Sequence, residues 1–205
     1  RTSRTVRATT MGDWSQEWRT KTLPHSDRGA NTIALYDGLL RNHVEGTKLG
    51  RVRLTALTGL QIETHIKSRS LAPSSQRSLH AALAAALHDA VRDKRLDDNP
   101  IRDAKRPRKP TVKRATQARA LSDQEVVRIL DATRGHHWSA FVVVALHTGL
   151  RRGELAGLRW SDIDLDARTL HVQRQATTFD DDAELKTVHS DRVVPLSETA
   201  RAALI

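Results

Sequence analysis

The sequence predicts a mainly α-helical protein with a small β component, divided into two folded domains. Apolar residues recur at three- and four-residue spacing through residues 11–100, which is the period of amphipathic helices. A basic, proline-containing stretch then interrupts this pattern, and residues 169–173 alternate as a strand does. The expected parts are an N-terminal linker remnant at 1–10, a helical domain at 11–100, a basic linker at 101–119 and a second domain at 120–205.

Helices should account for most of residues 11–100. Trp14 and Trp18 lie four residues apart on one amphipathic segment, and Tyr36 lies on the apolar side of a second helix, so we interpret all three as packing residues. A third helix should begin after Thr58.

The fourth helix, SLHAALAAALHDAVRDK, is the clearest in the chain and should follow the cluster at residues 72–75. Its alanines permit close packing on a neighbouring helix. An apolar residue at every fourth position forms one stripe, namely Leu79, Leu83, Leu87 and Val91. Asn99-Pro100 should close the helical domain, because the residue before a proline is pushed out of helical geometry.

The linker at residues 101–119 is strongly basic and has no apolar periodicity that would give it a core to join. Against the single acid Asp103 it carries Arg102, Lys105, Arg106, Arg108, Lys109, Lys113, Arg114 and Arg119. A run of charge is often merely solvated. Because this one separates two folded segments of a basic protein, we favour a strap that tracks phosphates, with the residues from Arg102 to Arg114 as the DNA-binding candidates.

The second domain should open with a helix at Ser122, whose hydroxyl and the Glu125 carboxylate form a capping box. Residues 138–146, WSAFVVVAL, are apolar almost all round and should be buried. A hairpin should follow the strand at 169–173 and return at 192–196, and Ser197 should cap a last helix.

Composition makes nucleic acid the first partner to test, although a soluble protein that merely happens to be basic fits the charge equally well. Lys and Arg number 34 against 24 Asp and Glu, a formal net charge of +10, as expected of a protein that meets a polyanion. The absence of cysteine excludes disulfides, thiolate metal sites and cysteine nucleophiles and fits a reducing compartment such as the cytoplasm. No apolar stretch approaches the roughly 20 residues of a membrane helix, and no zinc or phosphate-loop motif is present.

The most informative stretch is ALHTGLRRGELAGLRWSDIDL, which begins at residue 145. A helix should end near Gly149, because glycine permits a left-handed turn, and Arg151 should stand at the corner with Glu154 one turn into the next helix. A guanidinium suits a phosphate because its planar fork donates two parallel hydrogen bonds. An exposed arginine near a helix end is the plain alternative. We expect Trp160 to be a core residue rather than a base-stacking platform.

Two motifs in this order carry a family resemblance. HTGLRRGELAGLRWSDIDL resembles the first arginine motif of tyrosine recombinases, the phage-integrase family, and LKTVHSDRVVPLS resembles the lysine hairpin that follows it. The resemblance implies a helical core-binding (SAM-like) domain in residues 11–105 and the first part of a mixed α/β integrase catalytic domain in residues 120–205.

The resemblance also implies catalytic roles. Arg151 matches the arginine that contacts the scissile phosphate, and Lys186 matches the lysine that protonates the departing deoxyribose oxygen. Glu154 would be either a buried support of the corner or an ordinary helix ion-pair partner of a nearby arginine. The family reaction is site-specific DNA recombination and integration by paired transesterifications through a tyrosyl-phosphate, so neither a metal nor another cofactor is implied.

The only tyrosine is Tyr36, and the family's later His-x-x-Arg motif and nucleophilic tyrosine do not occur in the 205 residues, so we expect this chain not to cleave DNA by itself. The resemblance implies double-stranded DNA as the partner, together with an accessory DNA-bending or directionality factor. The complete protein should form a homotetramer on paired sites, whereas the fragment itself should be a monomer. The implied location is the nucleoid in the cytoplasm of a bacterium. The alternative is a non-catalytic DNA-binding fragment or regulator that occupies recombination sites. RNA binding ranks last because no aromatic-rich platform supports it.

Overall fold

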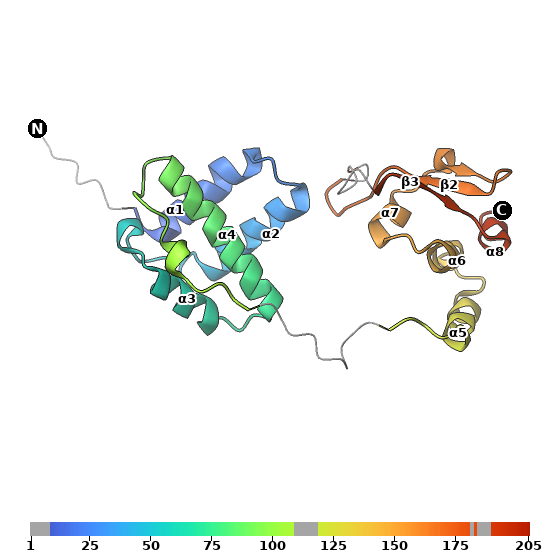
Figure 1. The fold of residues 1–205 in the computed structure, drawn as a ribbon, viewed down its shortest axis with the longest axis horizontal. Helices are drawn as coiled ribbons and strands as arrows, with labels where there is room; N and C mark the ends of the chain where they lie inside the picture. Colours follow the sequence, from blue (N-terminus) through green and yellow to red (C-terminus); the bar gives the residue numbers. More distant parts are fainter. Residues whose placement is uncertain (1–8, 109–118, 181–182, 184–189) are drawn as a thin grey trace, which may run out of the picture. The chain divides into compact units, whose positions relative to one another are not determined.

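The computed structural model describes residues 9–108, 119–180, 183 and 190–205. The chain divides into two compact units, Arg1–Ala115 and Thr116–Ile205. The first is built from helices, and the second combines helices with a three-stranded sheet (Figure 1). This confirms the predicted fold class, mainly α with a small β component. Among the described helices, none has the length and apolar character needed to cross a membrane.

The elements of the N-terminal unit begin where local signals place them. Capping boxes at Thr10 and Thr58 start α1 and α3, and Pro73 occupies the first turn of α4, where its missing N–H is no loss. The elements are α1 (Met11–Glu17), the π-helical turn η1 (Trp18–Thr22), the 3-10 turn η2 (Leu23–His25), α2 (Ala30–His43), η3 (Leu54–Ala56), α3 (Gly59–Ser68), α4 (Pro73–Arg92) and η4 (Pro100–Asp103).

Helix α4 is central to this unit and lies against both α2 and α3. Its predicted stripe is confirmed at Leu79, Leu83 and Leu87, which are fully buried, whereas Val91 is half-buried. The α4 alanines 82, 86 and 90 are also fully buried, so α2 can approach closely.

The two tryptophans of the first segment are core residues, as predicted. Trp14 donates its indole N–H to the Ala86 carbonyl oxygen at 2.9 Å, and Trp18 donates to Oδ2 of buried Asp89 at 2.7 Å. Each buried indole therefore keeps a hydrogen-bond partner while its ring fills the core. Tyr36 packs against the same core.

The packed part of the N-terminal unit extends past residue 100, where the sequence suggested that a linker begins. Ile101 and Ala104 are buried in the core, and Asn99 caps η4 by accepting from the Ile101 amide. Two apolar residues three apart are enough for one turn to dock, and the basic residues around them hid this pattern.

The C-terminal unit contains α5 (Asp123–Thr133), α6 (Ser139–Thr148), α7 (Arg152–Ala156), η6 (Trp160–Asp162), β1 (Ile163–Asp164), β2 (Thr169–Val172), β3 (Arg192–Pro195) and α8 (Glu198–Ala202). The strands form an antiparallel sheet in the order β1-β2-β3. The predicted capping box at Ser122 and the Ser197 cap of α8 are both confirmed. Residues from α6, α7, β2 and α8 meet in one core, which includes Val144, Leu155, Leu170, Val172 and Ala200.

Two aromatic residues of this unit are more exposed than the sequence suggested. Trp138, expected inside, is 52% exposed; it precedes α6 and packs edge-on against Phe141 at a ring distance of 5.4 Å. The expectation that Trp160 is a core residue is wrong, because the residue is 67% exposed; it lines an open, mainly apolar groove together with Phe141 and Leu204. The middle of α6, at Val143 and Val144, is buried as predicted.

Candidate functional site

Arg151 is presented at a sharp corner between α6 and α7. Helix α6 ends at Thr148, and Gly149 follows with a φ of +64°, in the left-handed region that favours glycine. Arg151 itself is the extended residue that precedes α7. Its side chain is 74% exposed, so the guanidinium faces solvent from a rigid turn.

The Glu154 carboxylate anchors this corner from inside. Its side chain is only 2% exposed. The Arg151 amide donates to Oε2 at 2.9 Å, and Arg151 Nη1 donates to Oε1 at 2.7 Å. Glu154 is therefore both buried and ion-paired within its own helix turn, which combines the two interpretations that the sequence left open.

A second guanidinium reaches the same carboxylate from a distant strand. Arg192, on β3, donates from Nη2 to Glu154 Oε2 at 2.9 Å and from Nη1 to Oε1 at 3.3 Å. Arg192 Nη1 also donates to the Ser190 carbonyl oxygen at 2.9 Å. The hydrogen bonds from Arg192 are the main reason that the pKa of the Glu154 carboxyl lies at about 2, below its ordinary value of 4.5; burial opposes this shift and the Arg151 bonds add to it.

Close backbone contact holds α7 in place. The Ala176 amide donates to the Gly153 carbonyl oxygen at 2.7 Å, and Gly157 packs so tightly that an added Cβ would lie 2.7 Å from the Ala176 nitrogen. Further along the chain, buried Asp162 accepts from the Arg159 amide and from Gln173 Nε2, both at 2.9 Å. The helix that carries Glu154 is thus clamped to the segment that follows β2.

Sequence reasoning did not identify Arg192 as a functional candidate. The signal was present in the S-x-R-x-V-P-L pattern, but we assigned that arginine only to a strand. The hairpin lysine, Lys186, lies outside the described residues, as do Lys109, Lys113 and Arg114 of the strap. The convergence of Lys186 with Arg151 therefore stays a prediction.

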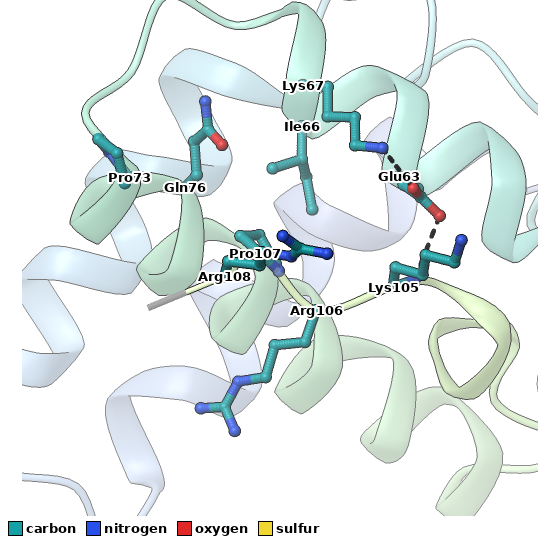
Figure 2. A pocket seen from close by; sticks show the side chains of 9 residues that line it. All are labelled: Glu63, Ile66, Lys67, Pro73, Gln76, Lys105, Arg106, Pro107 and Arg108. Atoms are coloured by element: carbon teal, nitrogen blue, oxygen red, sulfur yellow. Dashed lines mark hydrogen bonds and ion pairs between the residues drawn. The ribbon is translucent and has the colours of Figure 1, made fainter. Parts of the chain in front are cut away.

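In the N-terminal unit, three strap residues gather at one groove. A groove of about 740 Å³ lies between α3, the start of α4 and the strap, lined in part by Lys105, Arg106 and Arg108 (Figure 2). All three side chains belong to exposed residues. Arg102 does not line this groove; it pairs with Asp98 at 2.9 Å.

The charge of the groove is predominantly positive. Glu63, the one acid among the lining residues that the structure describes, accepts from Lys67 Nζ at 2.5 Å and from the Lys105 amide at 3.3 Å. These contacts, that of Lys67 first, lower the pKa of Glu63. Figure 2 shows Arg106 extending away from the Glu63–Lys67 pair. Burial, and then the charge of Arg106, lower the pKa of the nearby His80. The groove therefore offers several cationic side chains to an anionic ligand.

Comparisons with known proteins agree on one family. The model of the phage integrase family matches residues 119–205. A tyrosine recombinase XerC-like protein of Caldanaerobacter subterraneus is 30% identical over 204 residues, covering 91% of this chain and 52% of that protein. The integrase of Mycobacterium phage L5 is 28% identical over 193 residues, covering 91% of this chain and 49% of that protein. The chain thus spans about half the length of these curated relatives.

Solved structures show the same fold. The Tn1549 transposon integrase in complex with a circular intermediate DNA aligns with a TM-score of 0.68 at 21% identity, over 95% of this chain and 63% of that one. A lambda integrase tetramer bound to a Holliday junction aligns with a TM-score of 0.68 at 17% identity, over 94% of this chain and 53% of that one.

Proposed function

We propose that this chain is a member of the phage integrase family of tyrosine recombinases, that it binds duplex DNA at recombination core sites, and that it serves site-specific recombination and integration. The observation that carries this proposal is the exposed Arg151 guanidinium, held at a rigid corner by buried Glu154. A guanidinium in such a position can meet a backbone phosphate without first reorganising.

In this proposal Arg151 stabilises the charge on the scissile phosphate, and Lys186 protonates the leaving oxygen. The groove at Lys105, Arg106 and Arg108 contacts flanking phosphates and fixes the position of the duplex. Arg102 would join them only by exchanging its Asp98 partner for a phosphate. The reaction passes through a tyrosyl-phosphate, on a homotetramer at paired sites, assisted by a DNA-bending or directionality factor at the bacterial nucleoid.

Salt dependence tests the phosphate contacts. With six or more phosphates neutralised, affinity for a labelled duplex should fall about a thousandfold between about 50 and 200 mM salt. Arg106→Gln should reduce the slope of log affinity against log salt by about 0.9. The matched control is Lys21→Gln, which removes the exposed charge that pairs with Glu17 in the same unit and should leave the slope unchanged. A salt-independent affinity would contradict the proposal.

Strand exchange tests the corner. In a protein that joins this chain to the family's His-x-x-Arg and tyrosine motifs, Arg151→Ala should abolish recombination, a loss of at least about a hundredfold, while site binding weakens only by about fivefold. Arg152→Ala, which removes the exposed neighbouring charge, is the control and should keep most activity. Normal recombination by the Arg151 variant would remove this residue from the catalytic assignment.

The second candidate is DNA binding without cleavage, and Tyr36 favours it for these 205 residues. Tyr36, the sole tyrosine of the sequence, packs against the core of the N-terminal unit. The centre of its ring lies 5.9 Å from Cζ of Arg28. A nicked suicide duplex, which traps tyrosyl-phosphate adducts, should yield no covalent product with this chain. An adduct that Tyr36→Phe removes would overturn this second candidate.

A further inference from the structure

The corner holds one buried carboxylate between two guanidiniums. Glu154 contacts Arg151 from its own turn and Arg192 from β3, at distances from 2.7 to 3.3 Å. The Arg192 contact uses both oxygens, which is the bidentate geometry that makes arginine–carboxylate pairs strong and directional. The family resemblance implies a role for Arg151, whereas Arg192 has been given no role beyond its place in a strand.

The balance of charge at this corner depends on Arg192. With both arginines present, one negative and two positive charges leave a net charge of +1 beside the exposed face of Arg151. Without Arg192, Arg151 would be the one cation left beside the Glu154 carboxylate among the residues that the structure describes. The Glu154 side chain is only 2% exposed. An uncompensated buried charge is unfavourable, so the Arg151 guanidinium, whose Nη1 already lies 2.7 Å from Glu154 Oε1, would have to compensate the carboxylate by itself, and most of its charge would be cancelled.

The backbone of Arg192 is fixed by strand pairing. In the antiparallel ladder of β2 and β3, Arg192 lies opposite Val172, which is buried in the core. Its Nη1 is also held by the Ser190 carbonyl oxygen at 2.9 Å. The second guanidinium therefore reaches Glu154 from a rigid support, whereas a flexible surface arginine would lose more side-chain entropy on pairing.

We propose that Arg192 is a positioning residue: by pairing with Glu154 it compensates the buried carboxylate, so that the Arg151 guanidinium remains directed outward with its charge available to a phosphate. The inference rests on the proposed function for the contact between Arg151 and a phosphate. The charge coupling among Arg151, Glu154 and Arg192 does not depend on that function. The coupling makes Arg192 part of the phosphate site without any contact between Arg192 and DNA.

The first test measures the coupling without DNA. The Glu154 carboxyl is followed by carbon-13 NMR as pH is lowered, in the wild-type chain and in Arg192→Gln. The variant should raise the Glu154 pKa by about 1–3 units, the usual effect of losing an opposite charge at hydrogen-bond distance. Arg192→Lys, which keeps the charge but loses the fork, should restore at least half of this shift. Arg134→Gln, which breaks an exposed pair in the same unit, is the control and should cause no shift.

The second test is a double-mutant cycle on binding to a labelled duplex. Arg192→Gln should weaken binding by about fivefold, the size of one solvent-screened charge interaction. On an Arg151→Gln background the same change should have almost no further effect, because its action passes through Arg151. Effects that multiply independently would mean that Arg192 touches DNA directly, which overturns the inference.

The two tests separate the possible failures. An unchanged Glu154 pKa in Arg192→Gln overturns the positioning role whatever the DNA result. Full binding and recombination by the Arg151 variants overturns the proposed function at this corner instead. A purely structural role for Arg192 would lower thermal stability equally in the Gln and Lys variants, so the recovery expected from Arg192→Lys distinguishes positioning from folding.

Discussion

Protonation of Glu154 should make the C-terminal unit sensitive to acid in a defined range. The folded pKa of about 2 lies below the ordinary 4.5, so the carboxylate stabilises the fold above about pH 4.5, and this contribution disappears as pH falls through about 2. At about 1.4 kcal/mol per pKa unit the upper bound at neutral pH is roughly 3 kcal/mol. Because Arg151 is 74% exposed, solvent screening reduces the expected value to about 2 kcal/mol.

Glu154→Gln isolates this contribution. The variant keeps the shape of the side chain but leaves two guanidiniums without a counter-charge, so the unit should be about 2 kcal/mol less stable than wild type at pH 7. The gap should close as pH falls from about 5 to 2, because the wild-type carboxyl becomes neutral as well. Glu125, whose pKa is also held at about 2, chiefly by Arg119, is present in both proteins and cancels in the difference.

Native-state hydrogen exchange provides the assay, because it resolves the two units. Protection of the β2 and β3 amides, corrected for intrinsic exchange at each pH, gives the opening free energy of the C-terminal unit. The wild-type and Glu154→Gln values should converge in acid. A gap that stays constant from pH 7 to about 2 would show that the shape of the side chain, and not its charge, stabilises the corner.

Two further predictions concern packing. Gly157→Ala should destabilise the C-terminal unit by about 1–3 kcal/mol, because the new Cβ would lie 2.7 Å from the backbone nitrogen of Ala176. Thermal melting measures this loss. The control is Gly38→Ala, whose new Cβ would meet nothing within 4 Å and should cause no such loss. Trp18→Phe should destabilise the N-terminal unit by about 1–3 kcal/mol by removing the 2.7 Å bond to buried Asp89, and a denaturant titration that shows no loss would contradict this.

What could be predicted from the sequence was mostly local. The helix start after Thr58 and the capping box at Ser122 were both predicted, because the signals that mark a helix start lie within a few residues of each other. The corner was also accessible, since Gly149, Arg151 and Glu154 fall within six residues of one another. Each of these signals lies in residue types a few positions apart, whereas the role of Arg151 came only from the family resemblance.

What was missed depends on tertiary packing. The contact between Arg192 and Glu154 joins residues 38 apart, and no local period announces such a pair. Trp160 is large and apolar and was therefore assigned to the core, but it lines a groove open to solvent, and the residue is 67% exposed. Ile101 and Ala104 were hidden by charged neighbours, although two apolar residues three apart suffice to dock one turn.

The distance along the chain between Glu154 and Arg192 also has a consequence for biosynthesis. When the α6–α7 turn has emerged from the ribosome, Arg151 and Glu154 are available, but β3, which carries Arg192, has not yet been synthesised. The nascent polypeptide therefore cannot complete the corner until β3 has emerged and paired with β2. If Arg192 holds Arg151 in its outward orientation, this order of assembly keeps an unfinished chain from presenting a competent phosphate site to nearby nucleic acid during translation.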